Sequence, residues 1–221
     1  MDGVLFDTEK YYYDRRANFL AQKGISIDHL PPSFFIGGNT KQVWENILRD
    51  DYDNWDVPTL QEEYNAYKQD NPLPYKELIF PDVFKVLNEV NSRGLKIGLA
   101  SSSVKADILR ALEENHLNGF FDVVLSGEEF KESKPNPEIY LTALQHLNVE
   151  ASQALIIEDS EKGIAAGVAA DVEVWAIKDN RFGMDQVRKG LLDSFRCFRF
   201  NKIERHRACL LGVLMYQIKK L

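Results

Sequence analysis

The sequence predicts an α/β protein with a doubly wound, Rossmann-like parallel sheet that carries an all-helical insertion. Three observations predict this class. Apolar, strand-like runs alternate four times with helical segments after about residue 79, residues 8–78 show helical patterns without a strand signal, and the chain opens on "DGVLFDT", which reads as the end of a buried strand before a helix. We therefore expect an α/β core of residues 1–7 and 79–221 and a helical domain of residues 8–78.

The inserted domain is predicted to contain three helices. The first, "TEKYYYDRRANFLAQKGI" (8–25), begins at Thr8 as N-cap and stops at Gly24. The other two are "NTKQVWENILRDD" (39–51) and "TLQEEYNAYKQD" (59–70), and "DNPLPY" (70–75) breaks the last one.

In the core, four short apolar runs read as buried strands: "LKIGLAS" (95–101), "FDVVLSG" (121–127), "ALIIED" (154–159) and "VEVWAIK" (172–178). Helical segments are predicted over 81–93, 104–117, 136–147 and 161–170. This spacing suits right-handed crossovers, so the pattern predicts a parallel sheet with helices on both faces.

Charge and cysteine usage exclude several classes of protein. The 221 residues carry a net charge of -7, which argues against bulk nucleic-acid binding. Cys197 and Cys209 are the two cysteines, too few for a disulfide framework, so reduced thiols are expected. The chain opens without a basic-then-apolar leader, and the run "ACLLGVLMY" (208–216) is too short to span a bilayer. We expect a cytoplasmic protein with no membrane partner.

The last thirty residues differ in charge from the rest. Residues 191–221 are basic, whereas the chain as a whole is acidic. This segment is either a packed C-terminal element with a solvated basic face or a helix that binds a partner.

Polar residues follow the predicted strands at the sheet edge where ligands of open parallel sheets bind. They are Asp2, Ser101, Ser102, Ser103, Lys134, Glu158, Asp159 and Ser160. The serines would cradle a phosphate at a helix N-terminus or would simply cap that helix. Lys134 would be aimed by flanking prolines or would be a surface lysine. The adjacent carboxylates of Glu158 and Asp159 would hold Mg²⁺ or would be an ordinary acidic helix start.

Four stretches, "DGVLFDTE", "LASSS", "SKPNPEIY" and "IIEDSEKGIAAGVAA", resemble the four motifs of the haloacid dehalogenase-like phosphohydrolases. The order and spacing of the motifs fit over roughly residues 1–180. The resemblance is greatest to the subgroup with a helical cap domain that includes β-phosphoglucomutase and phosphoglycolate-type phosphatases. Residues 8–78 would then be this cap.

The resemblance implies a role for each matching residue. A nucleophilic aspartate would attack a phosphate ester to give an aspartyl-phosphate, with Mg²⁺ neutralising the oxygens. Asp2 would be the general acid and base, and its backbone carbonyl would ligate the metal. Ser101, Ser102 and Lys134 would hold the phosphoryl group, and Glu158 and Asp159 would bind Mg²⁺.

The first motif departs from the family pattern. The family reads Asp-x-Asp-Gly, and here Met1 stands at the middle position and Asp2 at the second aspartate. The nucleophile would lie one residue before Met1, after a first core strand, so the chain as printed is expected to be inactive. Either the chain starts at an internal methionine, or the protein lacks the nucleophile.

The expected function is a Mg²⁺-dependent phosphatase that acts on a small phosphorylated metabolite, such as a sugar phosphate. Two alternatives stay open: a β-phosphoglucomutase-like phosphotransferase, and a non-catalytic relative that binds a phosphorylated ligand or a protein partner. Tyr12 stands where the mutase branch has a hinge histidine, which weakens the mutase interpretation. Lys41, in "GGNTKQ", would contact a second anionic group of the substrate or would be a surface lysine.

Overall fold

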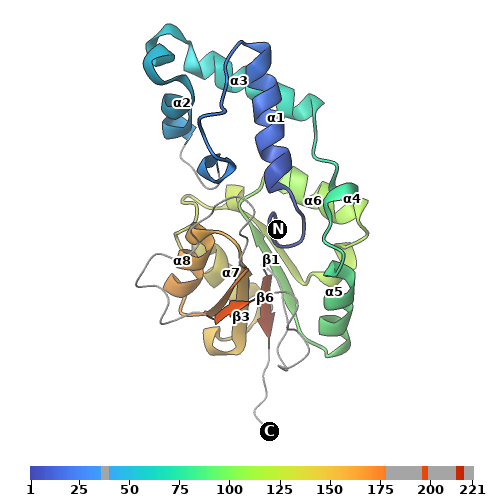
Figure 1. The fold of residues 1–221 in the computed structure, drawn as a ribbon. Coiled ribbons are helices and arrows are strands. Elements are labelled where there is room, and N and C mark those ends of the chain that lie inside the picture. The colour runs from blue at the N-terminus through green and yellow to red at the C-terminus, as the bar shows by residue number, and fades with distance from the viewer. Residues whose placement is uncertain (36–39, 178–195, 199–212, 217–221) are drawn as a thin grey trace. The chain divides into compact units, whose positions relative to one another are not determined.

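The computed structural model describes residues 1–35, 40–177, 196–198 and 213–216 (Figure 1). The chain forms two compact units. One contains Met1–Asp7 and resumes at Tyr75, and the other contains Thr8–Pro74. The first unit holds the sheet, and the described part of the second is helical.

The helical unit contains α1 (Glu9–Gln22), η1 (Pro32–Phe35), α2 (Thr40–Leu48), η2 (Arg49–Asn54) and α3 (Val57–Asp70). Helix α1 ends just before Gly24, whose φ of 74° suits a residue without a side chain. Helix α3 begins after Asp56, whose carboxylate accepts a hydrogen bond of 3.2 Å from the Thr59 amide. The C-terminus of α1 and the N-terminus of α3 therefore carry the local sequence signals that end and start helices.

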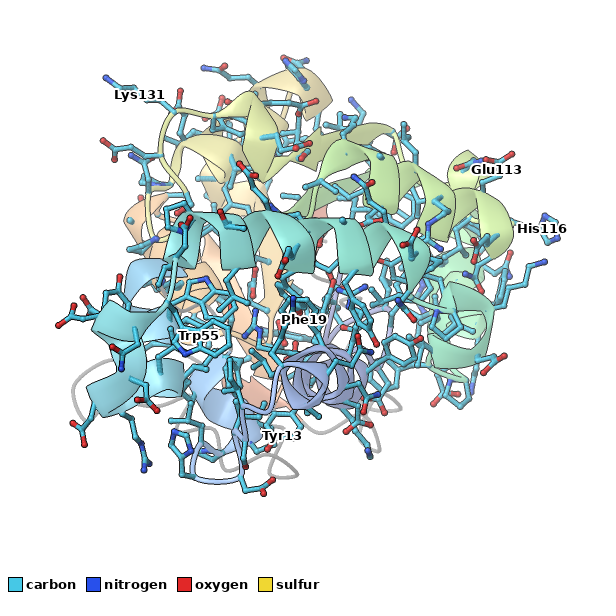
Figure 2. The ribbon with its side chains drawn as sticks, turned by 90° about the horizontal axis from the view of Figure 1, so that it is seen from above. Tyr13, Phe19, Trp55, Glu113, His116 and Lys131 are labelled. Atoms are coloured by element: carbon cyan, nitrogen blue, oxygen red, sulfur yellow. The ribbon has the colours of Figure 1, made fainter. Side chains whose placement is uncertain are left out.

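Aromatic side chains fill the core of this unit. Phe19 of α1, which is labelled in Figure 2, packs on Tyr64 of α3, with ring centroids 5.2 Å apart. Trp44 is buried and its indole N–H donates to Gln61 Oε1 at 2.8 Å. Because its one polar group is satisfied, this large ring can be buried without an unpaired donor.

The α/β unit is built around the β-strands β1 (Ile97–Ser101), β2 (Val123–Ser126), β3 (Ala154–Glu158), β4 (Glu173–Ile177), β5 (Arg196–Phe198) and β6 (Val213–Tyr216). Its helices are α4 (Tyr75–Leu78), α5 (Val83–Ser92), α6 (Lys105–Glu114), α7 (Glu138–Leu147) and α8 (Glu161–Ala169), with single turns η3 (Asn118–Phe120), η4 (Gly127–Glu129) and η5 (Ala151–Gln153). Figure 1 shows α7 and α8 on one side of the sheet and α5 and α6 on the other. The predicted doubly wound α/β class is thereby confirmed.

The strand order is β2-β1-β6-β3-β4-β5. Strands β1 and β2 pair in parallel, and so do β3 and β4, as the sequence predicts. Strand β5, which the sequence analysis did not predict, pairs in parallel with β4. Strands β1 and β3 are buried along their whole length, which explains why they read as continuous apolar runs.

One part of the sheet prediction is wrong: the sheet is not purely parallel. Strand β6 lies between β1 and β3 and runs antiparallel to both, with Met215 opposite Ile97 on one side and Leu155 on the other. Buried strands need a hydrogen-bonding neighbour on each side, and the C-terminal apolar run supplies it here. Part of the "ACLLGVLMY" run is therefore a packed strand, whereas most of the basic segment lies outside the described residues.

Candidate active site

Strands β1 and β3 both run antiparallel to β6, so their carboxyl ends lie at the same edge of the sheet. Lys134, from the loop before α7, reaches both of them. Its ammonium lies 2.6 Å from Glu158 Oε1 at the end of β3 and donates to the Ala100 carbonyl of β1 at 3.2 Å. Lys134 and Glu158, which are 24 positions apart in the sequence, are thus in direct contact, and both side chains are more than nine-tenths buried.

Glu158 is surrounded by donors. Its Oε1 also accepts a hydrogen bond of 2.6 Å from the Tyr140 hydroxyl, and its Oε2 accepts from the Ser160 hydroxyl at 3.1 Å and from the amides of Asp159 and Ser160. Burial alone would raise the pKa of Glu158, but the Lys134 ammonium and the hydrogen bonds from Lys134 and Tyr140 lower it from its ordinary value of 4.5 to about 2. The carboxylate is therefore ionised at neutral pH.

Helix α8 approaches this carboxylate closely because residue 163 is a glycine. A Cβ at Gly163 would lie 2.1 Å from Glu158 Cδ. The helix starts at Ser160, whose hydroxyl accepts a hydrogen bond of 3.1 Å from the Gly163 amide while it donates to Glu158. The "EDSEKG" stretch thus forms a helix start and a carboxylate-binding turn at once.

Tyr140 is a site residue that the sequence reasoning missed. Its hydroxyl binds Glu158, its ring lies 4.8 Å from the Lys134 ammonium, and the whole side chain is buried. Burial, followed by the neighbouring Glu158 carboxylate, raises the pKa of Tyr140 well above its usual value, so the phenol keeps its proton. An aromatic residue on the apolar face of a helix reads as core, and only its contact with Glu158 shows the second role.

Asp2 lies beside the end of β1. Its Oδ2 accepts a hydrogen bond of 2.5 Å from the Ser103 hydroxyl, while its Oδ1 is buried and has no hydrogen-bond partner in the described part of the chain. The adjacent Gly3 has a φ of 69°, and a Cβ there would lie 1.8 Å from Asp159 Oδ2. Asp2 is thus placed between the residue that follows β3 and the serines that follow β1.

The three serines precede helix α6 and do not cap it by a side chain. The N-cap residue is Val104, which makes no side-chain capping bond. Ser101 is buried and its hydroxyl accepts a hydrogen bond of 3.2 Å from the Ser103 amide, whereas Ser102 is exposed. Binding of a phosphate by Ser101 and Ser102 stays a prediction, but the alternative of a serine N-cap finds no support in this geometry.

The oxygen atoms at this edge fit a magnesium ion. Mg²⁺ is held in proteins by one or two carboxylates and keeps several of its waters. The Asp159 carboxylate next to Gly3 is a donor of this kind, and the family resemblance implies the backbone carbonyl of Asp2 as a second oxygen donor. No group of three or more metal-binding side chains occurs within the described ranges, and Glu158 is already held by five donors, so direct metal binding by Glu158 stays a prediction.

The helical unit carries the remaining predicted site residue. Lys41 lies in α2, and its side chain is outside the described part of the structure. Its predicted contact with substrate stays a prediction. Tyr12, at the position that weakens the mutase interpretation, lies in α1 with its ring 5.3 Å from the Arg15 guanidinium carbon.

Comparison with known proteins identifies the same family as the four sequence motifs. The profile of the haloacid dehalogenase-like hydrolases matches residues 1–177. The chain belongs to the haloacid dehalogenase-like hydrolase family. This confirms the resemblance that the four sequence motifs carry.

Two curated relatives and one solved structure resemble this chain over most of its length. The chain is 29% identical over 178 residues to a phosphorylated carbohydrates phosphatase of Thermotoga maritima, covering 78% of this chain and 80% of the relative. It is 28% identical over 172 residues to a phosphoglycolate phosphatase of Aquifex aeolicus, covering 77% and 78%. The crystal structure of β-phosphoglucomutase from Clostridium difficile superposes with a TM-score of 0.64 at 27% identity, and the match covers 80% of this chain and 82% of that one.

Among the helices that the structure describes, none is long and apolar enough to cross a membrane.

Proposed function

We propose that this family member is a Mg²⁺-dependent phosphatase of a small phosphorylated metabolite, with a sugar phosphate as the favoured substrate. The observation that carries the proposal is the cluster at the carboxyl ends of β1 and β3. There an ammonium, the Asp2 carboxylate, whose buried Oδ1 has no hydrogen-bond partner among the described residues, and serine hydroxyls come from segments far apart in sequence. The names of the phosphatase relatives support the same reaction class.

The roles of the residues follow from their surroundings. Lys134, fixed by Glu158, would place a positive charge against the phosphoryl oxygens, and the Ser101 hydroxyl would donate to one of them. Asp2 would give a proton to the leaving group and later take one from the attacking water. Asp159 and the backbone carbonyl of Asp2 would hold Mg²⁺, which would supply charge neutralisation to the phosphoryl group. The helical unit would select the rest of the substrate.

The covalent step needs an aspartate directly before Met1. In the proposed mechanism this aspartate attacks phosphorus, and the chain as printed would bind phosphate without turnover. Another carboxylate cannot replace it, because attack requires an in-line oxygen within about 3–3.5 Å of phosphorus.

The test compares three chains: the printed one, one extended by an apolar strand that ends in Asp before Met1, and the same extension ending in Asn. With Mg²⁺, only the Asp-extended chain is expected to release phosphate from p-nitrophenyl phosphate, at a rate more than about 10³-fold above the Asn control. EDTA should abolish the reaction and added Mg²⁺ should restore it.

The alternatives give different outcomes in the same experiment. Release of inorganic phosphate from a hexose phosphate supports the phosphatase, whereas formation of an isomeric sugar phosphate supports the phosphotransferase that the C. difficile structure suggests. Phosphate binding by calorimetry without turnover in the Asp-extended chain would contradict the proposal and favour the non-catalytic relative.

A further inference from the structure

The first residues of the chain lie across the gap between β1 and β3. Asp2 Oδ2 accepts a hydrogen bond of 2.5 Å from the hydroxyl of Ser103, which lies two residues beyond the end of β1. A Cβ at Gly3 would lie 1.8 Å from Oδ2 of Asp159, which directly follows β3. Met1 is buried at this end of the sheet, where Figure 1 marks the N-terminus. A residue joined to Met1 would therefore lie between the carboxyl ends of β1 and β3.

Strand β6 fills only one half of this gap. It pairs with Ile97–Leu99 of β1 and with Ala154–Leu155 of β3, which are the amino-terminal parts of two five-residue strands. Within the described ranges, no strand lies in the gap beside the carboxyl-terminal parts, Ala100–Ser101 and Ile156–Glu158. The half of the gap next to Met1 is thus the half that β6 leaves open.

A complete strand before Met1 does not fit in the open half alone. A strand that runs along the whole of β1 and β3 needs about five residues, at about 3.3 Å per residue. It would end at the carboxyl ends of β1 and β3, so it would run parallel to both. It would also need the backbone groups of Ile97–Leu99 and Ala154–Leu155 that β6 uses. Because each edge of a strand pairs with one neighbour, the two strands exclude each other.

We propose that β6 is an exchangeable occupant of the gap between β1 and β3, and that an apolar strand joined to Met1 displaces it. An apolar strand suits this place because β1 and β3 are buried along their whole length. The inference takes from the proposed function only the strand that ends in Asp before Met1. The state with β6 in the gap excludes this strand and is therefore inactive, which makes β6 an autoinhibitory element.

Hydrogen–deuterium exchange followed by mass spectrometry tests the displacement without any need for turnover. It compares the printed chain with the two chains that are extended before Met1 by an apolar strand ending in Asp or in Asn. The amides of β6 are expected to exchange more than about 10-fold faster in both extended chains, because they lose their strand partners. Strand β2 pairs with the other edge of β1 and is the internal control, with unchanged exchange. Equal exchange of β6 in all three chains would overturn the inference.

A proline in β6 provides a second, independent measurement. Leu214→Pro removes an N–H from the middle of β6, opposite Gly98. It is expected to lower the Tm of the printed chain by more than about 4 °C and that of the extended chains by less than about 2 °C. Leu214→Ile keeps the N–H and the side-chain volume, and as the matched control it should shift each Tm by less than about 2 °C. An equal fall in all chains, or no fall in the printed one, would contradict the exchange.

The outcomes separate this inference from the proposed function. Faster exchange of β6 without phosphate release in the Asp-extended chain would support the displacement and contradict the phosphatase. Phosphate release by a chain in which β6 stays protected would support the phosphatase and overturn the displacement.

Discussion

Replacing Lys134 with methionine is expected to lower the free energy of unfolding by about 3–5 kcal/mol at pH 7. The reason is that Glu158 would stay buried without the ammonium of Lys134. The Glu158 side chain is 7% exposed and would lose its ion pair with Lys134, whereas its hydrogen bonds from Tyr140 and Ser160 remain. A buried carboxylate without a counter-charge costs far more than the pair contributes while it is intact. Urea denaturation followed by circular dichroism measures the change.

The effect of Lys134→Met should depend on pH in a defined direction. In the native protein the pKa of Glu158 is lowered from 4.5 to about 2, because Lys134 outweighs the effect of burial. A lowered folded-state pKa contributes stability that is complete above about pH 4.5 and is lost as the pH falls through about 2. The difference between native protein and variant should therefore be large at pH 7 and much smaller near pH 2.

Two controls accompany this prediction. Lys131→Met removes a lysine that is exposed and labelled at the surface in Figure 2, and it should change stability by less than about 0.5 kcal/mol. Lys134→Met combined with Glu158→Gln removes both charges and should recover part of the lost stability. A loss below about 1 kcal/mol at pH 7, or the same loss at both pH values, would contradict the charge pairing between Lys134 and Glu158.

The sequence predicted those parts of the fold that depend on local patterns. Runs such as "ALIIE" and "KIGLA" are short and continuously apolar because β1 and β3 are buried on both faces, so they could be recognised without knowledge of their neighbours. The meeting of Lys134 and Glu158 could also be predicted, since the carboxyl ends of parallel strands share one edge of the sheet.

The features that depend on pairings between distant segments were not predicted. Nothing within "GVLMY" states that it will lie antiparallel between β1 and β3, because strand direction is set by the partners and the connection. The hydrogen bond between Ser103 and Asp2 joins residues 101 positions apart, and the serine run alone cannot show which hydroxyl makes it. Such contacts follow from the assembled sheet and not from local sequence.

Replacing Gly3 with alanine is expected to weaken Mg²⁺ binding more than about tenfold and to lower stability. The new Cβ would lie 1.8 Å from Asp159 Oδ2 and 2.5 Å from Asp159 Cγ, so the carboxylate must leave its position. Asp159 is 7% exposed, which leaves its side chain little room to move. The φ of 69° at Gly3 adds about 1–2 kcal/mol of backbone strain for a residue with a side chain. Mg²⁺ titration by calorimetry and thermal unfolding measure the two effects.

The helical unit offers a control that separates strain from displacement. Gly24 has a φ of 74°, close to that of Gly3, but a Cβ there would meet nothing within 4 Å. Gly24→Ala should therefore show the backbone strain alone, with a loss of about 1–2 kcal/mol in stability and no change in Mg²⁺ affinity. If Gly3→Ala and Gly24→Ala lower stability equally and both leave Mg²⁺ binding intact, Asp159 does not hold the metal. If only Gly3→Ala weakens binding, the close approach of the Asp2–Gly3 turn to Asp159 is what shapes the metal site.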